Sequence, residues 1–311
     1  MDRKIHKVYD VIMKIIILTY LIEFLKYLGE ERNISEILQT EITTLNGRTK
    51  YLDFLCRLDD DTLCHVEFQF PVAYAKDLSR FFNYNITSEI RYEKTTDTII
   101  FNFTAANRGE DELSIGESKD FHPKIFYLGN IDFEKEIEKI NIKLNLNQLE
   151  KIINGKRTEI KLTYKEELHL LLMSLAPKYK NKRKLLKYVI GLFENERLFH
   201  NEKLDTIKSI IQLEIDNLLD EYDRKYFKGA IKMNNETEKI IKKAVDDVNK
   251  KYEQEALYEA EQKGLKKGKE DGFKKGKEDA KKEIAKKLKG LHTPEQIAKI
   301  TGLSLNTIML L

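Results

Sequence analysis

The stretch that decides the fold is Tyr51–Phe70, which reads YLDFLCRLDDDTLCHVEFQF. Its even-numbered positions are apolar apart from Thr62: Leu52, Phe54, Cys56, Leu58, Cys64, Val66, Phe68 and Phe70. Its odd-numbered positions include the polar residues Asp53, Arg57, His65, Glu67 and Gln69. A period of two on both sides of the acidic run Asp59–Asp61 predicts a β-hairpin with one buried face. Because a slip of one residue would turn the apolar set outward, this pattern also fixes the register.

The predicted register brings two acidic residues together. With the loop at Asp59–Asp61, residues whose numbers sum to 120 face each other, so Asp53 is opposite Glu67. Directly opposed residues have Cβ atoms about 5 Å apart. Two carboxylates at that distance repel each other unless a cation or a proton lies between them. Such a pair suits Mg²⁺, which takes one or two carboxylates together with water and phosphate. The hairpin therefore indicates Asp53 and Glu67 as metal ligands, with Gln69 on the same face to orient water or contact phosphate.

A structural interpretation of the same hairpin stays open at this point, in which its polar face simply meets solvent. His65 is expected to be structural or solvent-facing, because the six histidines of the chain form no cluster with metal-ligand spacing. Cys56 and Cys64 face each other on the apolar side, so we expect buried packing residues rather than a redox pair.

The chain changes class near residue 145. Before that point the pattern predicts helices over 5–28 and Val72–Tyr92, and short strands over Thr98–Phe103 and Pro123–Leu128 with a polar loop between them over Asn107–Asp120. This alternation is typical of an α/β domain. The following segments are helical in pattern: Asn147–Ile153, Tyr164–Leu175, Lys182–Phe193, Lys203–Tyr222 and Asn235–Lys251. We therefore expect an α/β domain over 1–145, a helical domain over 146–251, a Gly/Lys-repeat helical linker over 252–289 and a helical hairpin over 290–311.

Composition excludes several classes of protein. A chain of 311 residues that is 41% hydrophobic is not wholly disordered, and its two cysteines exclude a disulfide scaffold. Near the N-terminus the longest uncharged stretch, Ile15–Ile22, is too short to cross a bilayer, so we expect a cytoplasmic protein without membrane contact. The net charge of +3 hides an acidic front: residues 1–130 contain 16 basic and 21 acidic residues.

The tail contains a repeat and a basic segment. GLKKGKED at Gly264–Asp271 is followed by GFKKGKED at Gly272–Asp279. Each glycine costs a helix roughly 1 kcal/mol relative to alanine, so a lone helix here should fray in water. Residues 263–289 carry 12 lysines and five acidic residues, and three uses stay open: a solvated linker, a phosphate contact, or self-association that makes a homo-oligomer. The last segment, Thr293–Leu311, resembles a helix-turn-helix, but its second helix has no Lys or Arg to read DNA, which favours an apolar helical hairpin.

The residues from Arg48 to Tyr84 resemble the Rpn family of recombination-promoting nucleases, which includes the YhgA-like transposases and belongs to the PD-(D/E)XK nuclease superfamily. The matching features are Gly47-Arg48 ahead of Asp53, the run Val66-Glu67-Phe68-Gln69, the R-x-x-x-Y helix with Arg80 and Tyr84, Tyr9-Asp10 in the opening helix, and the tail phrase Ile297–Ser304 after the glycine steps. The middle helices, about 146–250, match only loosely.

The resemblance implies a restriction-endonuclease-like mixed sheet flanked by helices that cuts DNA with Mg²⁺ or Mn²⁺. Asp53 and Glu67 would be the metal ligands, with the backbone carbonyl of Phe68 as a third. Gln69 stands where the superfamily pattern has lysine, although the Rpn family itself usually has glutamine there. Glutamine donates hydrogen bonds but brings no charge to the transition state.

Two further residues could join the predicted site. Glu41 could supply another carboxylate or be a solvated surface acid, and Arg80 could clamp a phosphate or form a helix-surface ion pair. The sequence thus predicts a metal-dependent DNA endonuclease. The alternative is a catalytically inactive DNA-binding or self-assembling protein that keeps the nuclease fold.

Overall fold

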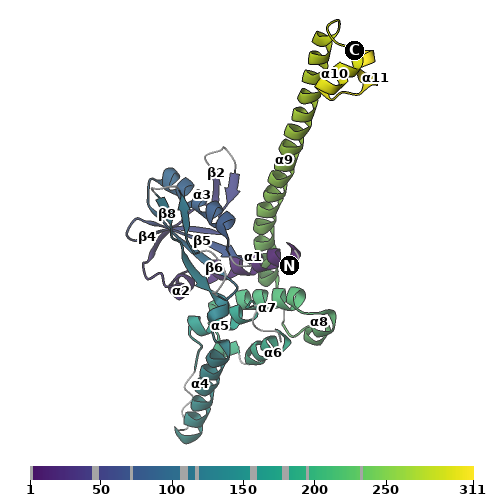
Figure 1. Ribbon diagram of the computed structural model, residues 1–311. Helices are drawn as coiled ribbons and strands as arrows, with labels where there is room; N and C mark the ends of the chain where they lie inside the picture. Colours follow the sequence, from purple (N-terminus) through teal and green to yellow (C-terminus); the bar gives the residue numbers. More distant parts are fainter. Residues whose placement is uncertain are drawn as a thin grey trace. The chain divides into compact units, whose positions relative to one another are not determined.

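The structure is a computed structural model (Figure 1). It describes residues 3–43, 49–70, 73–105, 111–115, 119–154, 160–176, 182–193, 196–231 and 234–311. The chain divides into two compact units, Met1–Lys251 and Tyr252–Leu311. The first unit has a mixed α/β architecture, as the sequence predicts, and each unit is described below by itself.

A five-stranded mixed sheet forms the centre of the first unit, in the order β1-β4-β5-β6-β9. Its strands are β1 (Ile34–Ile37), β4 (Phe54–Leu58), β5 (Leu63–Gln69), β6 (Thr96–Asn102) and β9 (Lys124–Tyr127). β4 pairs antiparallel with β1 and β5, whereas β6 runs parallel to β5 and β9. The predicted hairpin is confirmed, because Cys56 lies opposite Cys64 and Phe54 opposite Val66. Its turn places Asp61 in the left-handed region, at φ 68°.

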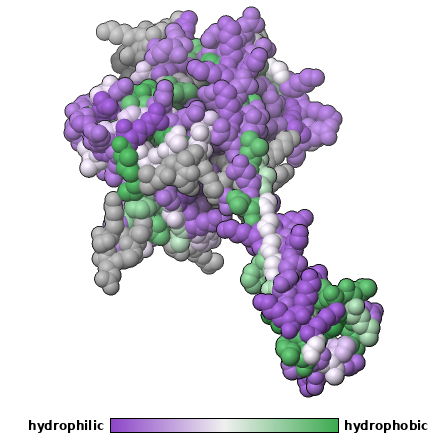
Figure 2. All heavy atoms as spheres, turned by 90° about the horizontal axis from the view of Figure 1, so that it is seen from above, coloured by the Kyte–Doolittle hydropathy of each residue, from purple (hydrophilic) through white to green (hydrophobic). Residues whose placement is uncertain are grey.

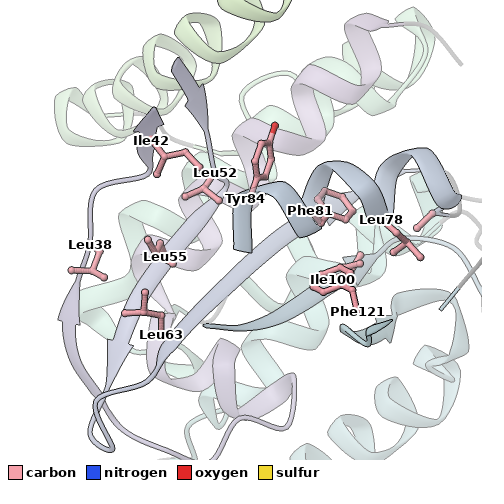
Figure 3. Packing of buried hydrophobic residues seen from close by; sticks show 11 residues of the cluster. Leu38, Ile42, Leu52, Leu55, Leu63, Leu78, Phe81, Tyr84, Ile100 and Phe121 are labelled. Carbon is pink, nitrogen blue, oxygen red and sulfur yellow. The ribbon is translucent and has the colours of Figure 1, made fainter. Parts of the chain in front are cut away.

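Helices cover both faces of the sheet, so β5 is buried along its whole length. On one face, α3 (Ala75–Tyr92) packs Leu78, Phe81 and Tyr84 against the strand residues Leu55, Leu63 and Ile100 (Figure 3). On the other face, Phe24 of α2 (Leu21–Tyr27) meets the rings of Phe68 and Phe101. The interpretation in which the polar side of the hairpin meets solvent is therefore wrong. The parallel strand β6 and the helix α3 that leads to it cover that side.

The strict alternation predicted for the hairpin breaks at its first strand. Leu52 carries an even number, yet it packs in the same cluster as the odd-numbered Leu55 and Leu63 (Figure 3). The backbone bends at Asp53, directly before β4 begins. Asp53 is therefore a bend residue at the end of the hairpin rather than a regular strand residue.

Several short strands were not predicted from the sequence. β2 (Glu41–Thr43) and β3 (Thr49–Tyr51) form one small antiparallel pair. β7 (Leu113–Ile115) and β8 (Lys119–Phe121) form another, which lies within Asn107–Asp120 except for Phe121, in a range where only a polar loop was expected. The ring of Phe121, at the end of β8, is buried 5.5 Å from the ring of Phe82 on α3, which ties the second pair to the core.

The rest of the first unit is helical, as expected. Its elements are η1 (Leu128–Asn130), α4 (Phe133–Asn154), α5 (Tyr164–Met173), α6 (Lys182–Phe193), η2 (Glu196–Leu198), η3 (Asn201–Lys203), α7 (Leu204–Leu218) and α8 (Glu221–Phe227). The helix predicted over Lys203–Tyr222 is in fact two helices, because Asp220 accepts a hydrogen bond from the backbone N–H of Asp223 and starts α8. α1 (Arg3–Thr19) packs against α7.

A polar cluster lies inside these helices. Glu214 of α7 is completely buried, and burial raises the pKa of its carboxyl group to about 8. The hydroxyl of Ser174 donates a hydrogen bond to it. The neighbouring Lys182 is also mostly buried, and desolvation lowers the pKa of its ammonium to about 8. Both shifts disfavour charge, as expected for ionisable groups taken out of water.

The second unit is built on the later part of α9 (Asn235–Leu288), which includes the glycine repeat as helix. α10 (Pro294–Thr301) and α11 (Leu305–Leu310) form the predicted hairpin, and their Ile297 and Ile308 are buried with Ala285 of α9. Gly302 ends α10 at φ 67°, a conformation that glycine adopts without a steric penalty. Within the described residues, no helix combines the length and the apolar character needed to cross a membrane.

Candidate functional site

Asp53 and Glu67 meet where β4 and β5 pair. The backbone N–H of Asp53 donates to Glu67 Oε1 at 3.1 Å, and the backbone N–H of Phe68 donates to Asp53 Oδ2 at 2.8 Å. Glu67 is thus bonded to the backbone of Asp53, and Asp53 to the backbone of the residue after Glu67. The side chain of Asp53 is 6% exposed and that of Glu67 is 3% exposed. These bonds hold both carboxylates in fixed positions at one end of the hairpin.

A chain of polar groups under α3 orients Glu67. His65 Nε2 lies 2.9 Å from Glu67 Oε1, so this nitrogen carries the proton and donates to the carboxylate. On the other side of the ring, Nδ1 lies 3.4 Å from the hydroxyl of Thr98 on β6, which in turn accepts from Asn85 of α3. His65 is fully buried, so of the two roles expected for it, structural or solvent-facing, the structure shows the structural one. The parallel strand supplies the partner that the hairpin alone lacks.

Gln69 and Arg80 contact each other rather than the carboxylates. Arg80 Nη2 donates to Gln69 Oε1 at 3.2 Å and lies 3.9 Å from Asp77 Oδ1, one turn earlier on α3. The guanidinium also lies over the ring of Phe81, 4.7 Å from its centroid. Since the oxygen of the Gln69 amide accepts from Arg80, its amide nitrogen is the group that can donate to a ligand.

A lysine from far along the chain reaches Asp53. Lys251 of α9 donates to Asp53 Oδ1 at 2.5 Å and lies 3.5 Å from Asp10 Oδ2 on α1. These groups line a cavity of about 470 Å³. Its wall combines residues of α1, of the segments from β1 to β4, of β5 and of α9: Asp10, Lys14, Leu18, Ile37, Leu38, Gln39, Thr40, Glu41, Tyr51, Leu52, Asp53, Phe54, Phe68, Asp247, Val248, Lys250 and Lys251. Asp53 therefore belongs both to the wall of this cavity and to the hydrogen-bonded pair that it forms with Glu67.

Glu41 is an exposed residue of β2 in the wall of that cavity. Burial and the neighbouring Glu41 carboxylate raise the pKa of Tyr51, which lies opposite on β3. Arg91 of α3 donates to the backbone carbonyl of Glu41 at 2.6 Å and so anchors β2 to the main domain. Glu41 therefore shares the cavity with Asp53, whereas Glu67, Gln69 and Arg80 stand outside its described lining.

The donor set suits a hard divalent ion such as Mg²⁺ or Mn²⁺. Both described hydrogen bonds of Glu67 use Oε1, so Oε2 is the oxygen that can face an ion. Asp53 accepts from the Phe68 N–H at Oδ2 and from Lys251 at Oδ1, so an ion at Asp53 would compete with an ammonium of like charge. In the part of the chain that the structure describes, no three His, Cys, Asp or Glu side chains group closely enough to hold a metal by themselves. Two carboxylates would therefore need water, phosphate or the Phe68 carbonyl to complete the coordination.

The two cysteines of the hairpin are buried and free, as expected. A hydrogen bond with Cys56, and then burial, raise the pKa of the Cys64 thiol well above its usual value. A raised pKa removes the thiolate that redox chemistry or nucleophilic attack needs. The pair therefore packs the α1–α2 side of the sheet and plays no part in the candidate site.

From the sequence we predicted five site residues: Asp53, Glu67, Gln69, Glu41 and Arg80. We did not predict Lys251, or Asp10 as its partner, because they come from helices whose sequences carry no local signal for a contact with the hairpin. His65 was expected to be structural or solvent-facing, and the structure shows the structural role. Of the motif pieces, Gly47-Arg48 lies outside the described residues. Comparison with protein-family models, with curated proteins and with solved structures found no significant match to the chain.

Proposed function

We propose that this chain is a metal-dependent DNA endonuclease with a restriction-endonuclease-like core, of the recombination-promoting type that its sequence resembles. The observation that carries the proposal is the junction of Asp53 and Glu67, two nearly buried carboxylates joined through reciprocal backbone hydrogen bonds. Taking two carboxylates out of water at one place is unfavourable unless cations or donors compensate them. Backbone N–H groups, His65 and Lys251 compensate these carboxylates in part, and a divalent cation would compensate both together.

Each residue has a role in the proposed reaction. Asp53 and Glu67 would hold a metal ion, with the Phe68 carbonyl as a further ligand, and His65 keeps the Glu67 carboxylate in place through its Nε2–H. A divalent ion bound there supplies a water of lowered pKa and neutralises charge on the phosphodiester. The amide nitrogen of Gln69 donates to that water or to a phosphate oxygen, while Arg80 fixes the orientation of the amide. Glu41 lies across the cavity as a further acidic group.

A cleavage assay tests the proposal. Purified protein should nick supercoiled plasmid DNA in Mg²⁺ or Mn²⁺ and be inactive in EDTA. Asp53→Asn is the informative variant, because its amide oxygen can still accept the Phe68 N–H while the charge for the ion is lost. We expect activity to fall by about 100-fold or more, in the range found when one transition-state contact is removed. Asp246→Ala, at an exposed acidic residue of α9, is the matched control and should keep full activity.

Equal cleavage by the wild type and by Asp53→Asn would overturn the assignment. DNA binding that weakens steeply with salt, with no cleavage in either metal, would instead favour the inactive DNA-binding alternative.

A specific observation also favours self-assembly through the second unit. Large apolar side chains are exposed on and beside α10 and α11, among them Leu291, Met309 and Leu310, the last 89% exposed. Figure 2 shows hydrophobic residues exposed on the surface of this unit. Exposed apolar clusters commonly mark protein interfaces. If they mediate a homo-oligomer, replacing Leu291 and Leu310 by Asp should reduce the molar mass measured by light scattering, and an unchanged mass would exclude this role.

A further inference from the structure

Lys251 stands out among the described residues because an ammonium group is held inside the candidate site by two carboxylates. It lies 198 positions from Asp53 in the sequence. Its side chain is only 18% exposed, and the side chains of Asp53 and Asp10 are 6% and 16% exposed. Partly buried ion pairs need good geometry to offset the loss of hydration. A lysine placed this deeply against a cavity wall is therefore more than a surface ion pair.

The charges around the cavity explain what this lysine can do. The described lining contains four acidic residues, Asp10, Glu41, Asp53 and Asp247, and three basic residues, Lys14, Lys250 and Lys251. The formal charge of this lining is therefore −1, and Glu67, the second proposed ligand of the ion, brings the charge of the site to −2, which repels phosphate. One divalent ion neutralises that charge and removes the repulsion. The cavity is therefore favourable for a phosphodiester only when an ion is bound.

The same ion competes with the ammonium for Asp53. Both are cations beside one carboxylate, and Lys251 already donates to Asp53 Oδ1, so repulsion between them favours displacement of the ammonium when the ion binds. Asp10 remains as a second partner at 3.5 Å and keeps the displaced ammonium at the cavity wall. An ammonium at that wall has three donors and faces the space that a bound phosphodiester would fill.

We propose that Lys251 is a substrate-binding residue of this site, held by Asp53 until a divalent ion displaces it and then available to the DNA phosphate. The proposal rests on the proposed function, since it takes DNA as the substrate and a metal at Asp53. Lys251 has two opposite effects: it weakens ion binding by competing for Asp53, and it strengthens DNA binding once the ion is in place. A purely structural lysine would not produce effects of opposite sign.

The test compares Lys251→Met with Lys250→Met. Methionine keeps the length and the packing of the lysine stem without its charge. Lys250 is the neighbouring exposed lysine in the same cavity wall, so its variant removes an equal charge. Calorimetry measures Ca²⁺ and Mg²⁺ affinity without DNA, and fluorescence anisotropy measures binding of a short labelled duplex in Ca²⁺. Lys251→Arg, which keeps the charge, is the second variant.

We expect Lys251→Met to bind the ions several-fold more tightly and the duplex about tenfold more weakly, the loss of one charged hydrogen bond. Lys250→Met should stay within about twofold of wild type in ion affinity, and Lys251→Arg should bind the duplex nearly as well as wild type. Unchanged ion and duplex affinities in Lys251→Met, or parallel losses in both, would overturn the proposal.

Failure of the proposed function gives a different pattern. If the wild type neither binds an ion nor depends on Asp53 for cleavage, the nuclease assignment and this inference fail together. If the wild type passes those tests and Lys251→Met behaves as Lys250→Met does, only the role of Lys251 fails.

Discussion

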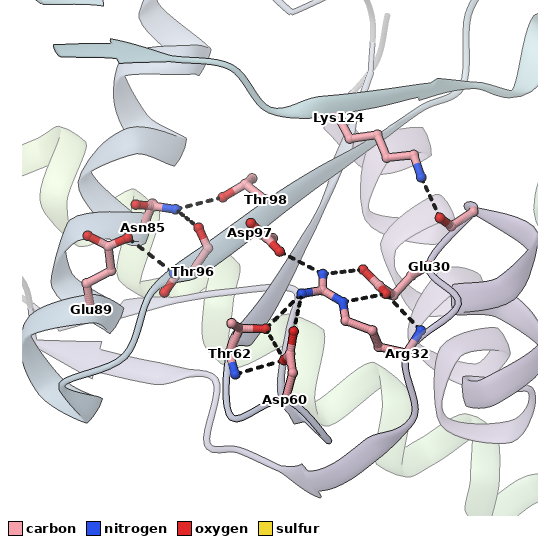
Figure 4. Close-up of polar contacts among 11 residues, drawn as sticks. Glu30, Arg32, Asp60, Thr62, Asn85, Glu89, Thr96, Asp97, Thr98 and Lys124 are labelled. Atoms are coloured by element: carbon pink, nitrogen blue, oxygen red, sulfur yellow. Dashed lines mark hydrogen bonds and ion pairs between the residues drawn. The ribbon is translucent and has the colours of Figure 1, made fainter.

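Replacing Arg32 by alanine should measurably destabilise the first unit, because this one side chain joins three separate segments. It lies between α2 and β1, and it donates to Glu30 through Nε and Nη2, at 2.8 and 2.7 Å (Figure 4). It also donates to Asp60 in the β4–β5 turn at 2.9 Å and to Asp97 at the start of β6 at 2.7 Å. The guanidinium therefore fixes the end of the sheet opposite the candidate site.

The magnitude comes mainly from the Glu30 contact. The side chain of Glu30 is only 10% exposed, and two parallel bonds to a guanidinium form the strong, bidentate type of ion pair. In Arg32→Ala the backbone N–H of residue 32 can still donate to Glu30, but this nearly buried carboxylate loses both guanidinium bonds, which costs about 2 kcal/mol. Asp60 and Asp97 are about half exposed, and exposed ion pairs contribute little. We therefore expect Arg32→Ala to lower the free energy of unfolding by about 2 kcal/mol.

Urea unfolding followed by circular dichroism measures this loss at pH 7. With a slope of about 2–3 kcal/mol/M, the urea concentration at the unfolding midpoint should fall by about 0.7–1 M. Arg32→Lys keeps the charge but lacks the fork, so it should recover only part of the loss. The hydrogen bond from Arg32 holds the pKa of Glu30 below its usual value. That contribution is present above about pH 4.5 and is lost as the pH falls through the lowered pKa, so the difference between wild type and variant should shrink as the pH is lowered below 4.5.

Two results would refute this reasoning. One is a loss below about 0.5 kcal/mol, the size expected of an ordinary exposed ion pair. The other is full recovery by Arg32→Lys, which would show that the charge alone matters and that the bidentate geometry contributes nothing.

Three further predictions concern the buried acid, the repeat and the core. Burial raises the pKa of Glu214 above its unfolded value of about 4.5, so its contribution to stability falls as the pH rises from 4.5 to about 8. Glu214→Gln should remove this decrease in the free energy of unfolding, which amounts to a few kcal/mol across that pH range. Gly268→Ala and Gly272→Ala, where an added methyl group meets open space, should each stabilise α9 by about 0.5–1 kcal/mol, and an unchanged helical signal at 222 nm on heating would contradict this. Phe101→Ala should cost about 3–5 kcal/mol in urea unfolding because it empties the aromatic cluster, whereas the 74% exposed Phe273→Ala should cost almost nothing.

The central hairpin could be predicted because its sequence determines it locally. Alternation with a period of two and three consecutive aspartates allow one register, and the observed pairing of Cys56 with Cys64 is that register. The pattern fails only at Asp53, where the backbone bends and Leu52 joins the cluster of Leu55. A bend at one residue cannot be recognised in the sequence pattern, because apolar and polar residues continue to alternate on both sides of the bend.

The short strands and the lysine of the site could not be predicted, for a different reason. β1 has only four residues, ISEI, and most of its side chains are exposed, so it carries no alternation to recognise. It becomes a strand because the backbone of β4 offers hydrogen bonds to it. Lys251 is likewise one of many lysines on a charged helix, and only the packing of α9 in the first unit separates it from Lys250. Information of this kind belongs to the tertiary structure.

The burial of the hairpin's polar side connects the fold with the proposed chemistry. A hairpin in isolation would leave His65, Glu67 and Gln69 in water, where their hydrogen bonds would exchange with solvent and fix nothing. Adding β6 and α3 removes that water, so each of these side chains must find a partner in the protein or cost stability. They find Thr98, the Asp53 backbone and Arg80. A buried network with fixed partners has few alternative arrangements, and a carboxylate held in this way loses little freedom when an ion binds. The fold therefore prepares Glu67 in advance and leaves Asp53, at the bend beside the cavity, as the carboxylate whose partner can change.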